Sequence, residues 1–306
     1  MSMPGKKHWP LGQVIWITLA AIILYSIVRL LPTGTNLSHM DFRPGGSSVE
    51  FCDPANPQFM PVVTVRSPVA MTLANDEAAS VGREVRVVAI LKTASGKPIT
   101  PEDLLVVHTQ KLHLLVSDPT LGDYQHLHPQ PGKNAGEWEF AFTPLRAGLY
   151  RIFADFTPAA TARGLYASAD LKVAERSGDV PEVVSTASNR TYENLGYTFE
   201  LRPAVELLKA GRLIDLTFTV SRRDGGNVSL QPVMGAFAHL VAFDAARSGY
   251  AHLHPNEIDL TRPLGPQQPR LTFKLTIPRA GRYVIWSQVK LDGREMFAPF
   301  WFEVVP

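Results

Sequence analysis

Six of the nine histidines form two sets of three with identical internal spacing. The first set is His113, His126 and His128, and the second set is His239, His252 and His254. Groups of two or three imidazole nitrogens suit Cu(II) or Zn(II), borderline ions that imidazole binds well. The spacing therefore predicts one metal site in each set, built from side chains that are close in the sequence.

Strand geometry predicts how each set would converge. His126 and His128 are two residues apart, so both side chains project from one face if this run is extended. The turn-like segment 118–123 (DPTLGD) predicts an antiparallel hairpin with His113 opposite His126 or His128. Cross-strand partners have Cβ atoms ~4.5–5.5 Å apart, so three rings would meet. The second set would repeat this arrangement.

The same histidines also admit a structural role or a contact with a partner or ligand. An imidazole in a β protein can hydrogen-bond a turn carbonyl, and an aspartate can hold the ring. Asp118 and Asp244 follow the first histidine of each set at the same offset and are candidates for that acceptor. The three interpretations stay open at this point, and metal binding is the leading one.

A residue upstream of each set differs between the two copies. His108 precedes His113 by the same offset at which Met234 precedes His239. If both contribute, the first site gains a fourth imidazole and the second a thioether, which favours Cu(I). We therefore predict that the second site retains copper better under reducing conditions. The alternative is that His108 lies in a surface loop and Met234 fills the core.

The single cysteine, Cys52, excludes several other kinds of chemistry. One cysteine cannot form a disulfide within the chain or a multi-cysteine metal site. A blue-copper site needs a thiolate close to two histidines, whereas Cys52 precedes both sets and has no counterpart in the second. The sequence also lacks GxSxG and HExxH motifs and glycine-rich phosphate loops. We expect no catalysis.

The two sets belong to an internal repeat of an all-β fold. Alternating apolar and polar residues between turn residues predict many short strands. Arg146-Ala147-Gly148 recurs as Arg279-Ala280-Gly281 before matching strands, in which Asp155 corresponds to Gln288. We predict two tandem Ig-like or cupredoxin-like β-sandwiches, at residues 61–176 and 193–306, joined by a polar linker at 177–192.

The N-terminal region predicts attachment to a membrane. Leu11–Leu31 is apolar, contains one base and no acid, and is long enough to cross a bilayer, so we take the lipid bilayer as a partner. A cleaved signal peptide is the alternative, but no Ala-x-Ala cleavage site follows. Lys6 and Lys7 precede the apolar segment, so we predict a cytoplasmic tail at 1–10 and export of the residues after the segment. Residues 32–60 are predicted to be a linker, and the whole chain is predicted to be a single-pass inner-membrane protein. The formal net charge of +2 gives no reason to expect nucleic acid as a partner.

The runs KLHLLVSD…DYQHLHP and AHLVAFD…GYAHLHP resemble exported bacterial β-sandwich domains with an H-L-x-V-S-x-D…H-L-H-P signature. Such domains are often uncharacterised or linked to copper and heavy-metal handling. The resemblance implies a membrane-anchored, periplasmic or extracellular protein with copper, or zinc, at the repeated histidines. The competing hypothesis is a non-catalytic accessory or scaffold subunit of a membrane-embedded respiratory or photosynthetic complex, with no metal of its own.

Overall fold

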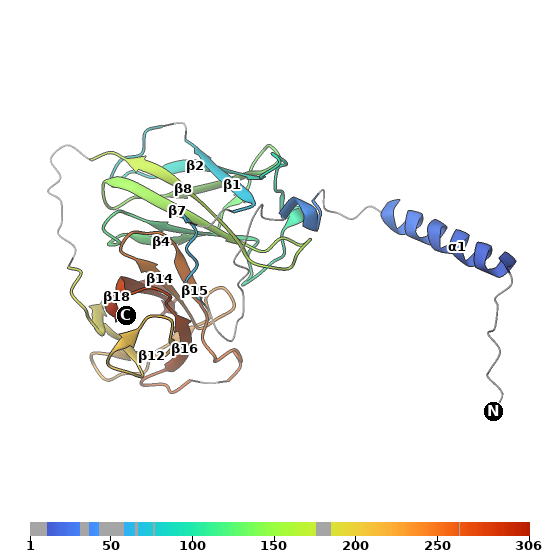
Figure 1. Ribbon diagram of the computed structural model, residues 1–306. Helices are drawn as coiled ribbons and strands as arrows, with labels where there is room; N and C mark the ends of the chain where they lie inside the picture. Colours follow the sequence, from blue (N-terminus) through green and yellow to red (C-terminus); the bar gives the residue numbers. More distant parts are fainter. Residues whose placement is uncertain are drawn as a thin grey trace, which may run out of the picture. The chain divides into compact units, whose positions relative to one another are not determined.

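The computed structural model of the protein describes residues 11–30, 37–42, 58–64, 67–75, 77–175, 185–262 and 264–306. Within these residues it contains one long helix and two β-sandwiches, which confirms the all-β tandem class (Figure 1). Residues 1–36 and 37–306 form separate compact units, so both sandwiches belong to one unit. Cys52 lies outside the described residues.

Helix α1 (Leu11–Leu30) is the part of the chain that could cross a membrane. Its segment Leu11–Val28 has the length and apolar composition of a membrane span and is not buried within the protein. A signal sequence near the N-terminus would have the same properties.

The first sandwich packs a sheet of order β1-β2-β6-β5 against one of order β4-β3-β7-β8. Strands such as β2 alternate between buried and exposed residues because one face meets the core and the other meets solvent. Trp138, Tyr150 and Leu91 are among its fully buried side chains. Its strands are β1 (Val69–Ala74), β2 (Val85–Thr93), β3 (Leu112–Ser117), β4 (Tyr124–Leu127), β5 (Gln130–Pro131), β6 (Glu137–Phe142), β7 (Gly148–Phe156) and β8 (Leu165–Val173).

The second sandwich repeats this plan, with sheets of order β16-β12-β10-β9 and β11-β18-β17-β14-β15. Strand β13 pairs with β17 beside the second sheet. Phe199, Phe218 and Phe273 are at the centre of its core. Its strands are β9 (Thr191–Asn194), β10 (Tyr197–Pro203), β11 (Leu208–Lys209), β12 (Leu213–Arg222), β13 (Leu230–Gln231), β14 (Ala238–Asp244), β15 (Tyr250–Leu253), β16 (Arg270–Thr276), β17 (Gly281–Leu291) and β18 (Arg294–Val305).

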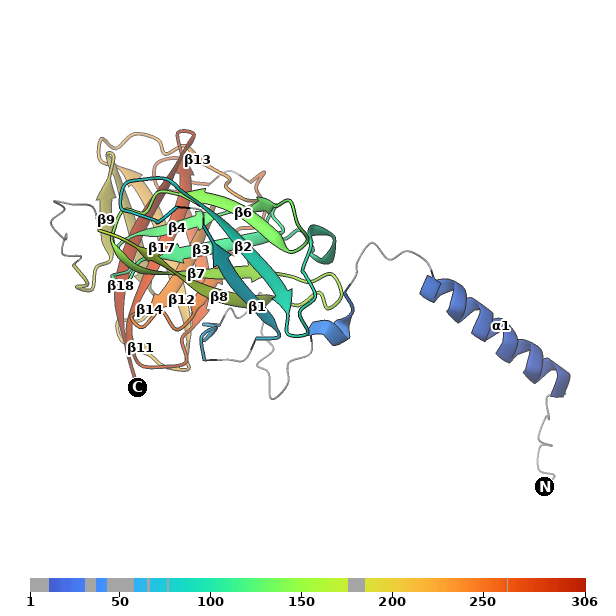
Figure 2. The ribbon, with the colours of Figure 1, turned by 90° about the horizontal axis from the view of Figure 1, so that it is seen from above.

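The histidine-bearing sheets of the two sandwiches pack against each other. Figure 1 shows β4 beside β14, and in Figure 2 β3 and β7 overlie β14 and β17. Every residue of β3 is buried because alternate side chains enter the sandwich core and the contact with the other sandwich. A third apolar cluster fills that contact, and it contains Leu115, Leu121, Tyr124, Phe153, Val241, Phe243, Tyr250, Val284, Trp286 and Trp301.

Parts of the expected linker at 32–60 pack onto both sandwiches. The 3-10 helix His39–Phe42 precedes the first sandwich, and Leu37 and Phe42 are buried in the first core. Phe59 enters the second core, and Met60 exchanges backbone hydrogen bonds with Tyr250 at 2.7 and 3.1 Å. The segment that contacts the second sandwich therefore precedes, in the sequence, the strands of the first sandwich.

Candidate metal centre

Each histidine set is assembled by one β-hairpin, as the spacing predicts. In the first sandwich β3 pairs antiparallel with β4, and Leu115 lies opposite His126. His113 is two residues before Leu115 and shares its face, and His128 follows β4 on the same face as His126. The three rings lie 4.9–5.3 Å apart, centroid to centroid. One nitrogen from each ring can therefore face a common centre.

The second hairpin, β14 with β15, reproduces this geometry. Val241 lies opposite His252, in the register that places Leu115 opposite His126. The centroids of His239, His252 and His254 are 4.7–5.5 Å apart. We call His113, His126 and His128 the first triad, and His239, His252 and His254 the second triad. In each triad, three nitrogens lie within 4.8 Å of one another.

Hydrogen bonds at the outer nitrogens fix the tautomers of the first triad. His113 Nε2 is 3.0 Å from the carbonyl oxygen of Val107, which only accepts, so Nε2 carries the proton. His126 Nδ1 lies 2.8 Å from Gln288 Oε1 and donates to it. The Gln288 amide donates through Nε2 to Glu295, which sets its orientation. The remaining nitrogens, His113 Nδ1 and His126 Nε2, therefore face each other with lone pairs, 3.1 Å apart.

The second triad has the same pattern with one chemical difference. His239 Nε2 donates to the carbonyl of Val233 at 3.0 Å, and His252 Nδ1 donates to Asp155 Oδ2 at 3.2 Å. His239 Nδ1 and His252 Nε2 are then 3.3 Å apart, again with facing lone pairs. Two facing lone pairs repel each other unless a proton or a cation lies between them. A carboxylate orients the second triad where an amide orients the first.

The third histidine of each triad has a buried nitrogen with no hydrogen-bond partner. Nε2 of His128 and Nε2 of His254 are inaccessible to solvent and unpartnered among the described residues. Buried polar nitrogens are usually hydrogen-bonded, so each such case calls for an explanation. In a tetrahedral site, metal–nitrogen bonds of about 2.1 Å place the ligand nitrogens ~3.4 Å apart. Nitrogens that lie within 4.8 Å of one another must therefore close by at most ~1.4 Å when an ion binds.

Burial keeps the triads in the neutral form that binds metals. It lowers the pKa of His126 and of His252 well below the usual histidine value, because their charged forms would lose solvation. Burial also lowers the pKa of His239 to about 3 and lowers the pKa of His113 and His254. Neutral imidazoles offer their lone pairs to a metal without first releasing a proton.

The aspartates that accompany each set stabilise loops and do not hold the rings. Asp118 accepts hydrogen bonds from the backbone of Gly122 and Asp123, both at 2.8 Å. Asp244 accepts from the backbone N–H and the hydroxyl of Ser248, at 2.6 and 2.7 Å. Asp118 and Asp244 are therefore not the acceptors for the rings that the sequence offered as an alternative. Among the described residues, the carboxylate that accepts a hydrogen bond from a triad histidine is Asp155.

His108 and Met234 occupy equivalent positions in two tight turns. His108 has φ of 49° and Met234 also has φ of 49°, a left-handed conformation that such turns require. The His108 ring stacks on His254, with centroids 3.6 Å apart, and is 6.4 Å from His113. His108, expected beside the first triad, therefore lies against the second. Met234 is partly buried, and its expected thioether contact stays a prediction.

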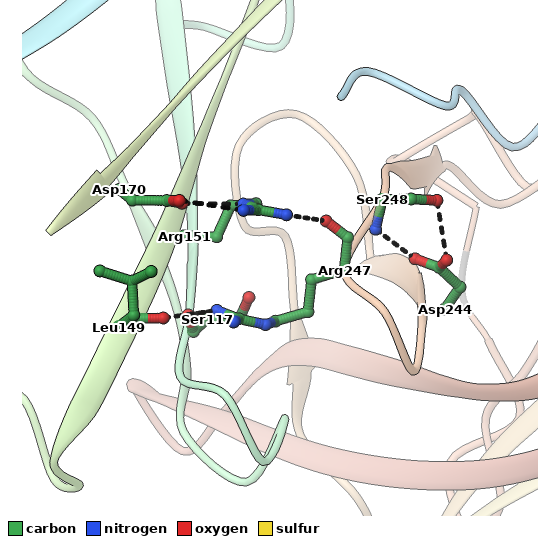
Figure 3. A network of polar contacts seen from close by, with 7 residues as sticks. All are labelled: Ser117, Leu149, Arg151, Asp170, Asp244, Arg247 and Ser248. Atoms are coloured by element: carbon green, nitrogen blue, oxygen red, sulfur yellow. Dashed lines mark hydrogen bonds and ion pairs between the residues drawn. The ribbon is translucent and has the colours of Figure 1, made fainter. Parts of the chain in front are cut away.

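A polar network of residues not singled out from the sequence joins the sandwiches beside the apolar contact (Figure 3). Arg247, between β14 and β15, donates to the carbonyl of Leu149 at 2.7 Å. Arg151 on β7 donates to the carbonyl of Arg247 at 2.9 Å and pairs with Asp170 at 2.8 Å. These bonds hold the sheets that carry the two triads in a fixed relation.

Comparison with known proteins adds a family and no activity. A family model described as "Domain of unknown function (DUF8832)" matches residues 64–173 and 191–306, one match for each sandwich. No curated protein matches the chain. A crystal structure of red sea bream transglutaminase is similar over 77% of this chain and 31% of that chain, at 10% identity and a TM-score of 0.23. That TM-score is too low to support an argument about fold or function.

Proposed function

Since the chain belongs to the DUF8832 family and carries its domain twice, we propose that it is a membrane-anchored metal-binding protein with one three-histidine site in each repeat. Copper is the proposed cargo, because imidazole sites bind Cu(II) more tightly than the other divalent ions of its row, Zn(II) included. Helix α1 would hold the sandwiches at the outer surface of the inner membrane, where they collect or hand over ions.

The observation that carries this proposal is the convergence of lone pairs in each triad. Two inner nitrogens face each other with lone pairs, because the outer nitrogens of the same rings donate their protons to acceptors. The third ring has a buried nitrogen without a partner among the described residues. A purely structural role would leave these atoms hydrogen-bonded. A cation satisfies all three, and the fixed outer hydrogen bonds are those that orient ligating histidines in metal proteins.

The decisive variants are His128→Leu and His254→Leu. Neither Nε2 makes a hydrogen bond with the described residues, so each substitution should leave the stability of the metal-free protein unchanged or slightly higher. A ligand role predicts loss of one metal ion per chain from each variant and of both ions from the double variant. Metal content is measured on the full chain in detergent after equilibration with Cu(II) or Zn(II).

His39→Leu is the matched control, because His39 is exposed in the short 3-10 helix before the first sandwich. It should bind as many ions as the unaltered chain. Unaltered protein that takes up no stoichiometric metal contradicts the proposal. Its recovery in a large assembly would instead favour the accessory-subunit hypothesis. Protease added to cells whose outer surface of the inner membrane has been made accessible tests the orientation and should cut residues after Pro32.

A further inference from the structure

The two repeats exchange the side chains that orient their histidines. Asp155 on β7 is the register partner of His113, and Gln288 on β17 is the register partner of His239. Each nevertheless bonds to a histidine of the other sandwich, Asp155 to His252 and Gln288 to His126. One histidine of each triad is therefore oriented by the opposite repeat, so the contact between sandwiches sets the orientation of a ring in both triads.

The exchanged side chains differ in charge. Asp155 presents a carboxylate oxygen to His252, and its side chain is 21% exposed. A carboxylate acceptor raises the basicity of the ring and offsets part of the charge of a bound cation. Gln288 presents a neutral amide to His126, and the carboxylate of Glu295 behind it is exposed to solvent. The charge of Asp155 also acts on His113, its register partner, but only His252 receives its hydrogen bond. The second triad thus has a charged hydrogen-bond partner where the first has a neutral one.

The two triads also touch each other. The centroids of His126 and His252 are 5.3 Å apart, and those of His113 and His252 are 5.8 Å apart. The first separation lies within the range found inside the second triad, 4.7 to 5.5 Å, and the second is only slightly larger. Two divalent ions held by contacting rings repel each other strongly, because the surrounding protein screens charge less than water does. Occupation of one triad must therefore weaken binding at the other.

From this exchange and contact we infer that the triads fill in a fixed order: the second triad binds a divalent ion first and retains it, and the first triad binds a second, exchangeable ion. The inference rests on the proposed metal-binding function and adds to it a division of roles. Asp155 acts as a positioning residue for His252. The first triad, with its neutral orienting amide, is the point at which ions enter and leave.

The test is titration of the full chain in detergent with Zn(II) against a chromophoric chelator. Unaltered protein should bind two ions in two resolved steps. His128→Leu should retain only the tight step, and His254→Leu only a weaker step. That weaker step should be tighter than the second step of the unaltered protein, because the charge of the first ion is absent. Equal, independent affinities for the two ions would overturn the inference while leaving metal binding intact.

Replacement of the orienting groups tests the cause of the order. In the His128→Leu background, Asp155→Ala should weaken Zn(II) binding to the second triad about 10- to 100-fold, as loss of such partners does in other metal sites. Asp155→Asn should restore part of this loss, since the amide still accepts from His252. Gln288→Glu combined with Glu295→Gln should tighten the first triad, assayed in the His254→Leu background. Thermal unfolding without metal shows whether each variant is folded.

Two results would reject the role given to Asp155. One is an unchanged affinity of the second triad in the folded Asp155→Ala variant. The other is an equal loss at the first triad when the same substitution is assayed in the His254→Leu background, which would indicate a general disturbance of the contact between sandwiches. Absence of Zn(II) binding by the unaltered chain would instead reject the proposed function itself.

Discussion

Leu121 and Arg247 occupy the same position in two equivalent loops, and each offers its backbone carbonyl to the other sandwich. Both have left-handed backbone conformations, with φ of 58° and 51°. The carbonyl of Leu121 accepts from the indole N–H of Trp286 at 3.2 Å, and that of Arg247 accepts from Arg151 at 2.9 Å. The loop conformation that positions these carbonyls also fixes how the two sheets meet.

We expect Arg247→Met to destabilise the protein by about 1–3 kcal/mol. Methionine keeps much of the apolar stem but removes the donor to the carbonyls of Leu149 and Ser117, and the second of these contacts is partly buried. Urea unfolding of the full chain in detergent measures the change. Arg86→Met is the control, because the Arg86 side chain is 89% exposed and its loss should alter stability by less than ~0.5 kcal/mol. Equal effects of the two substitutions would contradict a clamping role for Arg247.

Gly249→Ala should detach the segment 58–64 from the second sandwich. A Cβ atom at Gly249 would lie 1.7 Å from the carbonyl oxygen of Met60, so the two backbones could not keep their hydrogen bonds. We expect a loss of about 1–3 kcal/mol, typical of overpacking, and faster proteolysis within 58–64. Gly265→Ala is the control, because its added Cβ would have only an ordinary contact, 3.6 Å from Gln268 O. Similar proteolysis of both variants would refute this prediction.

The metal-free protein should lose stability as the pH falls below about 6.5. Burial lowers the pKa of the triad histidines in the folded state, so the unfolded chain binds more protons in acid. Each histidine that is protonated only after unfolding contributes about 1.4 kcal/mol per pH unit, between its unfolded and folded pKa. This stability is fully present above the unfolded pKa. Urea unfolding from pH 7.5 to 5 in the presence of a chelator measures the slope.

The variant His128→Leu/His254→Leu provides the comparison for this pH dependence. Burial lowers the pKa of both histidines, so removing them should make the slope shallower. His39→Leu should leave the slope unchanged, because His39 is exposed. A slope identical in all three proteins would show that groups outside the triads cause the acid sensitivity.

His108→Ala should weaken Zn(II) binding by the second triad and not by the first. The His108 ring stacks on His254, and an aromatic contact of this kind contributes ~0.5–1.5 kcal/mol, or about two- to tenfold in affinity. The titration is made in the His128→Leu background, with His254→Leu as the reciprocal case. Weaker Zn(II) binding by the first triad would contradict this prediction and would show that His108 acts on the first triad, as the sequence predicts.

Met234→Leu is the matched substitution at the equivalent turn position. It keeps the side-chain volume and removes the sulfur, so it should leave Zn(II) affinity unchanged. If the thioether contributes to copper binding, the same variant should retain less Cu(I) in the presence of a reductant. Unchanged Cu(I) retention would show that Met234 only fills space.

Spacing was sufficient to predict each triad, but it could not show where the two triads would meet. The i, i+2 histidines and the turn at 118–123 are local signals, and the hairpins have the predicted pairing. The contact between sandwiches joins residues more than a hundred positions apart, and no local periodicity specifies it. One signal was available, since the run Leu112–Ser117 lacks polar alternation, as expected of a strand buried on both faces. The partner of that second face could not be read from the sequence.

Asp155 and Gln288, which are equivalent positions in the two repeats, show a different limit of what the sequence can predict. Their equivalence in the repeat could be predicted, and it indicated that the two sites differ. From the repeat alone, each residue would be expected near the histidines of its own copy. In the folded chain, each instead bonds to a histidine of the other copy. Crossing of this kind follows from how the sheets dock, which is a tertiary property.

The contact between β3 and β14 brings the same patch of each repeat together. Each repeat supplies an acceptor to a histidine of the other, Asp155 to His252 and Gln288 to His126. Such a contact is isologous, the type that relates the two subunits of a symmetric dimer. A single copy of the repeat would therefore carry a surface complementary to itself, on which a second copy could supply the residue that orients a histidine of each triad. Joining the copies in one chain frees the two halves to diverge, so an acidic residue at 155 and an amide at 288 can coexist. Symmetry supplies two sites, and covalent linkage allows them to differ.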